Sequence, residues 1–200
     1  MSDCATGVKP IHHLTSFVHE LLAKRIMPGD AVMDGTAGNG FDSEFLWNCV
    51  KPGGQLYVFD VQSEAIDKTK DRLIMNGWNE NDHMTVQMHC ASHGEAEKVI
   101  REPLQAVMFN LGYLPGSDKK IITEWTEMKR CLDFVTSKGL KNGGIISIIS
   151  YGGHPGGERE QYHLLEYAEN MSSPTWNATF IRTCGTIKKA PVLIMIEKKM

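Results

Sequence analysis

The chain has 200 residues, 42% of them hydrophobic, and a formal net charge of −3. This suits one globular domain with a substantial core and excludes a globally basic nucleic-acid-binding protein, so any RNA contact must be local. Five scattered cysteines without a C-x-x-C pair argue against a zinc site or a disulfide framework. The sequence shows neither a signal-peptide pattern nor an apolar run of membrane length, which predicts a cytoplasmic protein without membrane contact.

The first predicted elements lead into a glycine-rich turn. Residues 1–10 are expected to be a disordered lead and residues 11–200 a single domain. From Ile11 to Ile26, apolar residues recur at helical spacing, which predicts a helix. Three histidines on or beside it are assigned no role: His12, His13 and His19. Pro28-Gly29-Asp30 ends the helix, and the apolar run Ala31-Val32-Met33 predicts a buried strand.

The stretch Asp34–Asp42 lies where this strand ends and the next helix begins. Glycine there permits positive φ and lets a ligand approach the backbone closely. The free N–H groups and the positive end of the new helix also face that ligand. A Gly-x-Gly turn can equally serve geometry alone, so a nucleotide-like ligand and a structural turn both stay open. The candidate binding residues of this stretch are Asp34, Thr36, Gly38, Asn39, Gly40 and Asp42.

The next strand, Gln55–Phe59, is followed by Asp60, Val61 and Gln62. An acidic residue about 20 positions after a glycine-rich turn is placed to bind a ribose diol. The dinucleotide fingerprint fails, because Ser43 stands where its third glycine would be. Asp34 would also repel a pyrophosphate, whereas it could pair with the ammonium group of an amino acid. These features favour S-adenosylmethionine over NAD, and a methyltransferase as the function.

The rest of the chain alternates helices and strands. Helical spacing predicts helices over residues 63–76, 95–101, 121–138 and 158–171, and apolar runs predict strands over residues 84–88, 106–109, 145–149, 178–184 and 192–198. Residues 141–144 are predicted to form a turn. Nearly continuous apolar strands alternating with helices indicate a parallel sheet with helices on both faces, and the closing pair suggests an antiparallel edge strand. The predicted fold is α/β: a Rossmann-like class I methyltransferase with a mostly parallel seven-stranded sheet.

Further stretches follow strands whose carboxyl ends should meet at one edge of the sheet. Asn110-Leu111-Gly112-Tyr113 has the length and place of the Asn-Pro-Pro-Tyr motif of amino-methyltransferases. The Asn110 side chain could orient the N–H bonds of an amine, and Tyr113 could stack on a base or face a sulfonium. A turn cap and a packed ring are the alternative interpretations. Ser92-His93 stands where such folds hold adenine.

No metal-ligand set or serine elbow is visible in the sequence. Methyl transfer from a sulfonium depends mainly on aligning the nucleophile, the methyl group and the leaving sulfur. We therefore expect positioning residues rather than a catalytic triad. His154, in a glycine-rich loop, is a candidate proton acceptor or an ordinary loop histidine. The catalytic candidates are Asn110, Tyr113 and His154.

Four motifs together resemble the bacterial rRNA methylase family: Asp34–Asp42, Phe59–Gln62, Asn110–Pro115 and Tyr151–His154. The resemblance covers nearly the whole chain. It implies S-adenosylmethionine-dependent N-methylation of 5-aminomethyl-2-thiouridine at the wobble position of tRNA, with the anticodon stem-loop as partner. The cofactor contacts it implies are Asn39, Asp60, Gln62 and His93. The residues it implies at the target uridine are Asn110, Tyr113, Tyr151 and His154, with Leu111, Gly112 and Lys189 as further substrate candidates.

Three positions depart from the family pattern: Gly35 replaces a usual alanine, Ser43 a frequent threonine and Lys189 a frequent asparagine. The first two are small and leave the cofactor assignment intact. The alternatives are an rRNA or small-molecule methyltransferase on the same fold, or a non-catalytic binding module, because a fold does not fix a substrate. The tRNA enzyme is distinguished from the other methyltransferases by whether four lysines line the mouth of the site as a phosphate-binding rim: Lys119, Lys120, Lys188 and Lys189. The exposed first helix leaves room for a homodimer.

Overall fold

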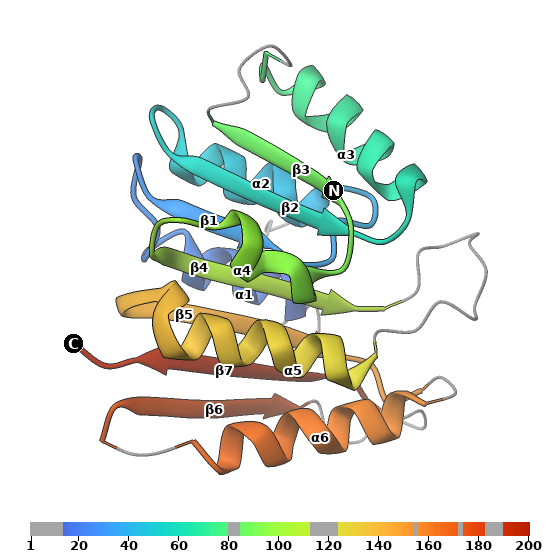
Figure 1. The fold of residues 1–200 in the computed structure, drawn as a ribbon, viewed down its shortest axis with the longest axis vertical. Coiled ribbons are helices and arrows are strands. Elements are labelled where there is room, and N and C mark those ends of the chain that lie inside the picture. Colours follow the sequence, from blue (N-terminus) through green and yellow to red (C-terminus); the bar gives the residue numbers. More distant parts are fainter. Residues whose placement is uncertain (1–13, 80–84, 113–123, 154–155, 172–173, 183–189) are drawn as a thin grey trace, which may run out of the picture.

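The computed structural model describes residues 14–79, 85–112, 124–153, 156–171, 174–182 and 190–200. Its centre is one sheet with the strand order β3-β2-β1-β4-β5-β7-β6 (Figure 1). The strands are β1 (Ala31–Asp34), β2 (Gln55–Asp60), β3 (Val86–Cys90), β4 (Leu104–Leu111), β5 (Leu140–Ser150), β6 (Trp176–Arg182) and β7 (Val192–Lys198). β7 runs antiparallel to both neighbours, and the other pairings are parallel. The predicted mostly parallel seven-stranded sheet is confirmed.

Helices cover both faces of this sheet, as predicted. They are α1 (Leu14–Leu22), α2 (Phe41–Val50), α3 (Ser63–Met75), α4 (Ala96–Val99), α5 (Trp125–Phe134) and α6 (Gly157–Glu169), with a 3₁₀ turn at His93–Glu95 and a π turn, η2, at Val135–Gly139. α4, α5 and α6 lie in front of the sheet in Figure 1, and α1 and α2 lie behind it. Among the helices of the described part, none is long and apolar enough to cross a membrane.

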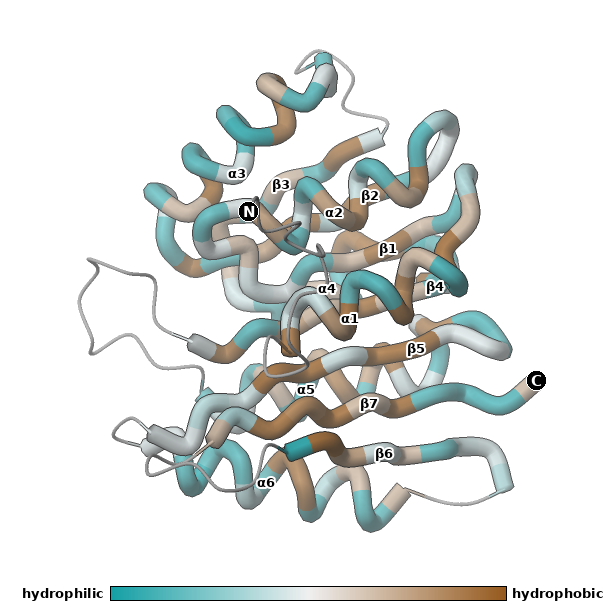
Figure 2. The backbone as a smooth tube through the Cα atoms, turned by 180° about the vertical axis from the view of Figure 1, so that it is seen from behind, coloured by the Kyte–Doolittle hydropathy of each residue, from teal (hydrophilic) through white to brown (hydrophobic). Residues whose placement is uncertain are grey.

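Two apolar clusters pack against the two faces. On β1, Met33 belongs to the cluster under α5 and α6, and its neighbour Val32 belongs to the cluster under α1 and α2. On β4, Phe109 belongs to the cluster under α5 and α6, and Met108 belongs to the cluster under α1 and α2. Because successive side chains of a strand point to opposite faces, a strand covered on both sides is apolar at nearly every position. Figure 2 shows this as brown stretches along β5 and β7.

Several predicted boundaries are wrong by a few residues. The predicted turn at residues 141–144 lies inside β5, where a register shift between Leu104 and Ala106 of β4 marks an irregularity in the ladder and Gly143 has φ 75°. Glycine at positive φ is typical of a bulge as well as of a turn. The third strand runs to Cys90, since its pairing with β2 continues to Asp60. The described part of the fifth helix ends at Phe134 and continues as η2.

The strand order indicates where a ligand would bind at this sheet. β1 pairs with β2 on one side and with β4 on the other, so the chain changes direction across the sheet between β1 and β4. In open α/β sheets, ligands bind beyond the carboxyl ends of strands at such a switch point. The residues that follow β1, β2, β4 and β5 therefore gather at the same edge.

Candidate active site

Two glycines shape the turn between β1 and α2. Gly38 has φ 54° and Gly40 has φ 78°, values that strain a residue with a Cβ. Gly40 is the N-cap of α2, and a Cβ on it would lie 2.8 Å from the Thr69 Cα of α3. Gly40 is therefore needed both for the backbone conformation and for the close packing of α2 on α3.

Asp60, at the end of β2, ties the two neighbouring loops together. The Gly38 N–H donates to Asp60 Oδ2 at 3.0 Å, and the Gln62 N–H donates to Oδ1 at 2.9 Å. The side chain stays half-buried. Each carboxylate oxygen can accept more than one hydrogen bond, so acceptor capacity is left for a ligand. Asp60 has the place and the free lone pairs to accept hydrogen bonds from a ribose diol.

Asp34 is buried beneath the same turn. The Ser43 hydroxyl donates to Asp34 Oδ2 at 2.5 Å, and the Thr36 N–H donates to Oδ1 at 3.1 Å. Burial, together with the nearby Asp42 carboxylate, raises the pKa of Asp34 to about 7. Ser43, the residue that breaks the dinucleotide fingerprint, is thus the hydrogen-bond partner of this carboxyl. The predicted contact of Asp34 with a ligand ammonium stays a prediction.

Gly35 has a packing explanation in this chain. A Cβ there would lie 2.1 Å from the nearest ring carbon of Phe109, a buried residue of β4. The space that an alanine methyl group would need is therefore occupied by the Phe109 ring. In this chain, Gly35 is therefore explained by its contact with Phe109, the residue that precedes Asn110.

Asn110 lies at the centre of a hydrogen-bonded group next to this turn. Its backbone N–H donates to the Thr36 hydroxyl at 2.7 Å, and its side-chain Nδ2 donates to Asp42 Oδ2 at 3.3 Å. The other Asp42 oxygen, Oδ1, lies 2.6 Å from Nε2 of His19 in α1. Only 8% of the Asp42 side chain and 24% of the His19 side chain are exposed. An ionised carboxylate can only accept, so the amide nitrogen of Asn110 faces Asp42 and its carbonyl oxygen faces away.

Tyr151, just after β5, joins this group from the other side. Its ring lies 3.5 Å from the position that a Cβ on Gly112 would take, so it covers the end of β4. Burial and the Asp42 carboxylate raise the pKa of the Tyr151 phenol, and a hydrogen bond with the Thr15 side chain of α1 partly offsets this. Tyr151, Asp42 and Asn110 therefore lie close to one another.

Ser92 and His93 lie at the start of the 3₁₀ turn that follows β3, and His93 packs against β4. The Ser92 hydroxyl accepts from the Gly94 N–H at 3.1 Å and donates to Glu127 at 2.9 Å. The His93 ring is buried edge-on against Phe109, and burial lowers its pKa to about 4. Its Nε2 is buried and has no hydrogen-bond partner in the described part of the chain. The adenine contact of Ser92 and His93 stays a prediction.

Other predicted residues are placed in part. The Asn39 carbonyl oxygen accepts from the Arg72 side chain at 2.9 Å, and Leu111 is buried in the core cluster under α5, so neither assignment is tested by these contacts. Gly112 is exposed. Several predicted site residues lie outside the described residues: Tyr113, His154, Lys119, Lys120, Lys188 and Lys189.

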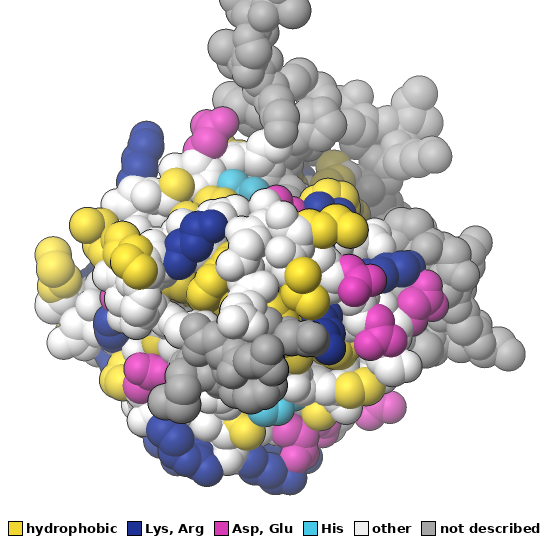
Figure 3. Space-filling view, turned by 90° about the horizontal axis from the view of Figure 1, so that it is seen from above, with side chains coloured by type: hydrophobic (Ala, Val, Ile, Leu, Met, Phe, Trp, Pro, Cys, Tyr) yellow, Lys and Arg dark blue, Asp and Glu magenta, His cyan; other side chains and the backbone are white. Residues whose placement is uncertain are grey.

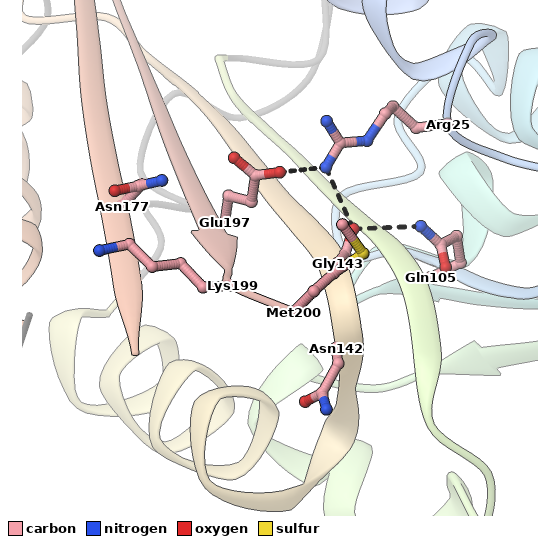
Figure 4. Close-up of a pocket in the computed structure, with 8 residues that line it drawn as sticks. All are labelled: Arg25, Gln105, Asn142, Gly143, Asn177, Glu197, Lys199 and Met200. Atoms are coloured by element: carbon pink, nitrogen blue, oxygen red, sulfur yellow. Dashed lines mark hydrogen bonds and ion pairs between the residues drawn. The ribbon is translucent and has the colours of Figure 1, made fainter. Parts of the chain in front are cut away.

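A pocket of about 450 Å³ lies at the amino ends of β4 and β5, away from the residues described so far (Figure 4). Gln105 at the start of β4, Gly143 near the start of β5 and Glu197 near the end of β7 line it. The Arg25 side chain enters from the segment after α1, where it pairs with Glu197 and donates to the Gly143 carbonyl oxygen. None of the residues predicted from the motifs lines this pocket.

The residues around Asp60 fit S-adenosylmethionine better than a metal or a dinucleotide. Within the described ranges, no group of three or more His, Cys, Asp or Glu residues could hold a metal ion. Asp34 and Asp60 place two acidic side chains at the turn, and Ser43 stands where a dinucleotide site has its third glycine. A cofactor with a ribose diol and an ammonium group suits these acidic surroundings. The positive φ of Gly38 favours glycine at this position, and glycine leaves the backbone beside Asp60 without a side chain.

Comparison with known proteins finds relatives that are described as methylases or methyltransferases. Residues 56–197 match the model of a family described as "Putative rRNA methylase". The chain is also 30% identical, over 192 residues, to the chloroplastic tRNA (mnm(5)s(2)U34)-methyltransferase of Arabidopsis thaliana. That match covers 92% of this chain and 69% of the relative.

Solved structures agree with the fold. The "putative rRNA-methylase" of Clostridium thermocellum superimposes with a TM-score of 0.85 at 31% identity, covering 92% of this chain and 96% of that one. SMU.1697c of Streptococcus mutans, in complex with SAH, superimposes with a TM-score of 0.82 at 28% identity, covering 96% and 98%. The fold is thus shared with a protein whose solved structure contains SAH, the demethylated product of S-adenosylmethionine.

Proposed function

Because the chain belongs to the rRNA methylase family and is an S-adenosylmethionine-dependent methyltransferase, we propose that it methylates an amine on RNA. The specific reaction that we propose is conversion of 5-aminomethyl-2-thiouridine to 5-methylaminomethyl-2-thiouridine at the wobble position of tRNA. The name of the Arabidopsis relative supports this choice, since it is a methyltransferase of mnm(5)s(2)U34.

The single observation that carries the proposal is the fixed orientation of Asn110. Its amide nitrogen donates to Asp42, and its backbone N–H donates to Thr36. The amide oxygen is therefore left as an acceptor near the carboxyl end of β4. A primary amine has N–H bonds to donate and must present its lone pair elsewhere, so one fixed acceptor can orient it.

The cofactor would be held on the side of β1 and β2. Asp60 would accept from the ribose hydroxyls, with the turn at Gly38 and Gly40 beside it. S-adenosylmethionine, when bound, supplies a methyl group activated by a positively charged sulfur. The contribution of the protein is to hold the acceptor amine at the proper place, and the carboxylate of Asp42 favours a hydrogen-donating group there.

A further part of the proposal concerns the residues that contact the RNA. On the face drawn in Figure 3, Lys and Arg side chains are interspersed with Asp and Glu side chains. The net charge of −3 likewise gives no overall attraction to RNA. We therefore assign the contact with the anticodon stem-loop to the four lysines at 119, 120, 188 and 189. A homodimer, the cytoplasmic location and a single domain over residues 11–200 belong to the same proposal.

A direct test is methyl transfer from labelled S-adenosylmethionine to two pools of tRNA. One pool carries 5-aminomethyl-2-thiouridine and the other carries unmodified 2-thiouridine at the wobble position. We expect label only in the first pool, located by nucleoside analysis as the methylaminomethyl product. Label in neither pool, with cofactor binding intact, would contradict the tRNA reaction and favour rRNA or a small amine as acceptor.

A further inference from the structure

His19 and Thr15 form one flank of α1 that faces the acceptor side of the site. Leu14, Val18 and Leu22 are buried on the sheet-facing side of the helix. Thr15 and His19 are four positions apart, so they lie one above the other beside that buried stripe. Thr15 hydrogen-bonds Tyr151, and His19 contacts Asp42. The helix thus brings two polar groups into contact with Tyr151 and Asp42, which lie beside Asn110.

The His19 ring is fixed by two contacts. It stacks on Phe45 of α2 with a centroid distance of 4.0 Å and an interplanar angle of 5°. Its Nε2 lies 2.6 Å from Asp42 Oδ1. Since the carboxylate accepts, Nε2 carries the proton in this pair. A charged acceptor makes this a strong type of hydrogen bond, and the low exposure of Asp42 protects it from solvent screening.

Without His19, the Asp42 carboxylate would have unfavourable surroundings. It is largely buried, and the Asp34 carboxyl and the Tyr151 phenol both lie close enough to interact with it. The donors on the two Asp42 oxygens are His19 and Asn110. A buried carboxylate that loses one donor tends to rotate toward others or to take up a proton. Either change would release the Asn110 amide from its single orientation.

We propose that His19 and Asp42 are the positioning pair for the acceptor amine. His19 holds the Asp42 carboxylate, and Asp42 holds the Asn110 amide with its carbonyl oxygen toward the amine N–H. This rests on the proposed function in one respect, that the acceptor is an amine. His19 touches neither cofactor nor acceptor in this arrangement, so it acts through Asp42 and not as a proton acceptor. The first helix is thereby part of the acceptor site.

The test compares His19→Ala, His19→Gln and Glu20→Ala in the full chain. Glutamine retains an N–H donor and cannot titrate near neutral pH. Glu20 is exposed on the same helix, so its replacement controls for effects on α1 in general. The measurements are kcat and KM with tRNA carrying 5-aminomethyl-2-thiouridine, from pH 6 to 9, the Kd for S-adenosylmethionine and the melting temperature. A nitrogen-15 NMR spectrum of the His19 ring, in wild type and in Asp42→Asn, reports the pair without any activity.

For His19→Ala we expect kcat to fall on the order of 10- to 100-fold, because misplacing a reacting group by about 1 Å has effects of this size. We expect His19→Gln to recover most of that loss with an unchanged pH profile, and Glu20→Ala to match wild type. The Kd for S-adenosylmethionine should stay the same in all three variants. The ring spectrum should show a protonated Nε2 whose signal shifts in Asp42→Asn.

Two results would overturn the proposal. If His19→Gln were as inactive as His19→Ala and the acidic limb of the pH profile were lost, His19 would be the proton acceptor itself. If His19→Ala lowered the melting temperature and weakened cofactor binding, its role would be structural. Failure of wild type on both tRNA pools would count against the proposed function alone, because the NMR result still decides whether the pair exists.

Discussion

The Asp60 carboxylate accepts a hydrogen bond from the Gly38 N–H at 3.0 Å, across 22 positions of the chain. Its other oxygen accepts from the Gln62 N–H. One side chain therefore holds the loop after β1 and the loop after β2 in a fixed relation, and a ligand that bridges these loops depends on it. Hydrogen bonds to a charged group contribute about 1.5–3 kcal/mol each.

For Asp60→Ala we expect the Kd for S-adenosylmethionine to rise at least about 100-fold, since the anchor of the turn and the acceptors for the ribose are lost together. Isothermal titration calorimetry measures this directly. Asp67→Ala, at an exposed position on α3, is the matched control and should bind like wild type. An unchanged Kd in Asp60→Ala would move the ribose away from β2.

Asn110→Ala separates acceptor orientation from cofactor binding. The variant loses the amide oxygen that faces the acceptor, while the Asn110 N–H to Thr36 is a backbone contact and persists. We expect kcat to fall on the order of 100-fold with the Kd for S-adenosylmethionine unchanged. Single-turnover methylation of tRNA together with calorimetry gives both quantities. Equal loss of binding and turnover would show that Asn110 serves the cofactor instead.

Gly40→Ala tests the packing under the turn. Alanine at φ 78° costs about 1–2 kcal/mol, and its Cβ would also press against the Thr69 backbone at 2.8 Å. We expect a loss of at least about 2 kcal/mol in the free energy of unfolding, measured by urea denaturation. Gly77→Ala is the control, because Gly77 has φ 91° but no atom within 4 Å of its Cβ position. Equal losses in the two variants would mean that the contact with α3 costs nothing.

Much of this arrangement could be predicted from local sequence. Strands buried on both faces are continuous apolar runs, so β1, β2, β4 and β5 were visible, and their shared direction placed Asp60 and Asn110 at one edge. The end of β4 was predicted two residues too early, at Phe109, because the polar Asn110 follows directly, whereas the pairing of β4 with β5 continues to Leu111.

The parts that could not be predicted depend on contacts between distant positions. His19 is 23 positions from Asp42. The sequence pattern of an amphipathic helix does not distinguish a polar residue that faces solvent from one that faces a site. The spacing of Thr15 and His19 beside the buried stripe was the available signal. The bulge in β5 was not predicted, because a glycine such as Gly143 is as typical of a turn as of a bulge, and its positive φ is known only from the structure.

The buried carboxyl of Asp34 should make the stability of the fold depend on pH. Its pKa is about 7 in the folded chain and 3.8 as the ordinary value, so between these values the folded state holds a proton that the unfolded state has lost. Stability therefore falls as pH rises from about 4 to 7, by up to about 1.4 kcal/mol per pH unit, and levels off above that range. Asp34→Asn keeps an acceptor for the Thr36 N–H and cannot ionise, so its melting temperature should change less between pH 5 and pH 7.5 than that of wild type. Asp71→Asn, exposed on α3, should keep the wild-type slope. A slope that Asp34→Asn leaves unchanged would mean that Asp34 is ionised throughout, with its charge balanced within the turn.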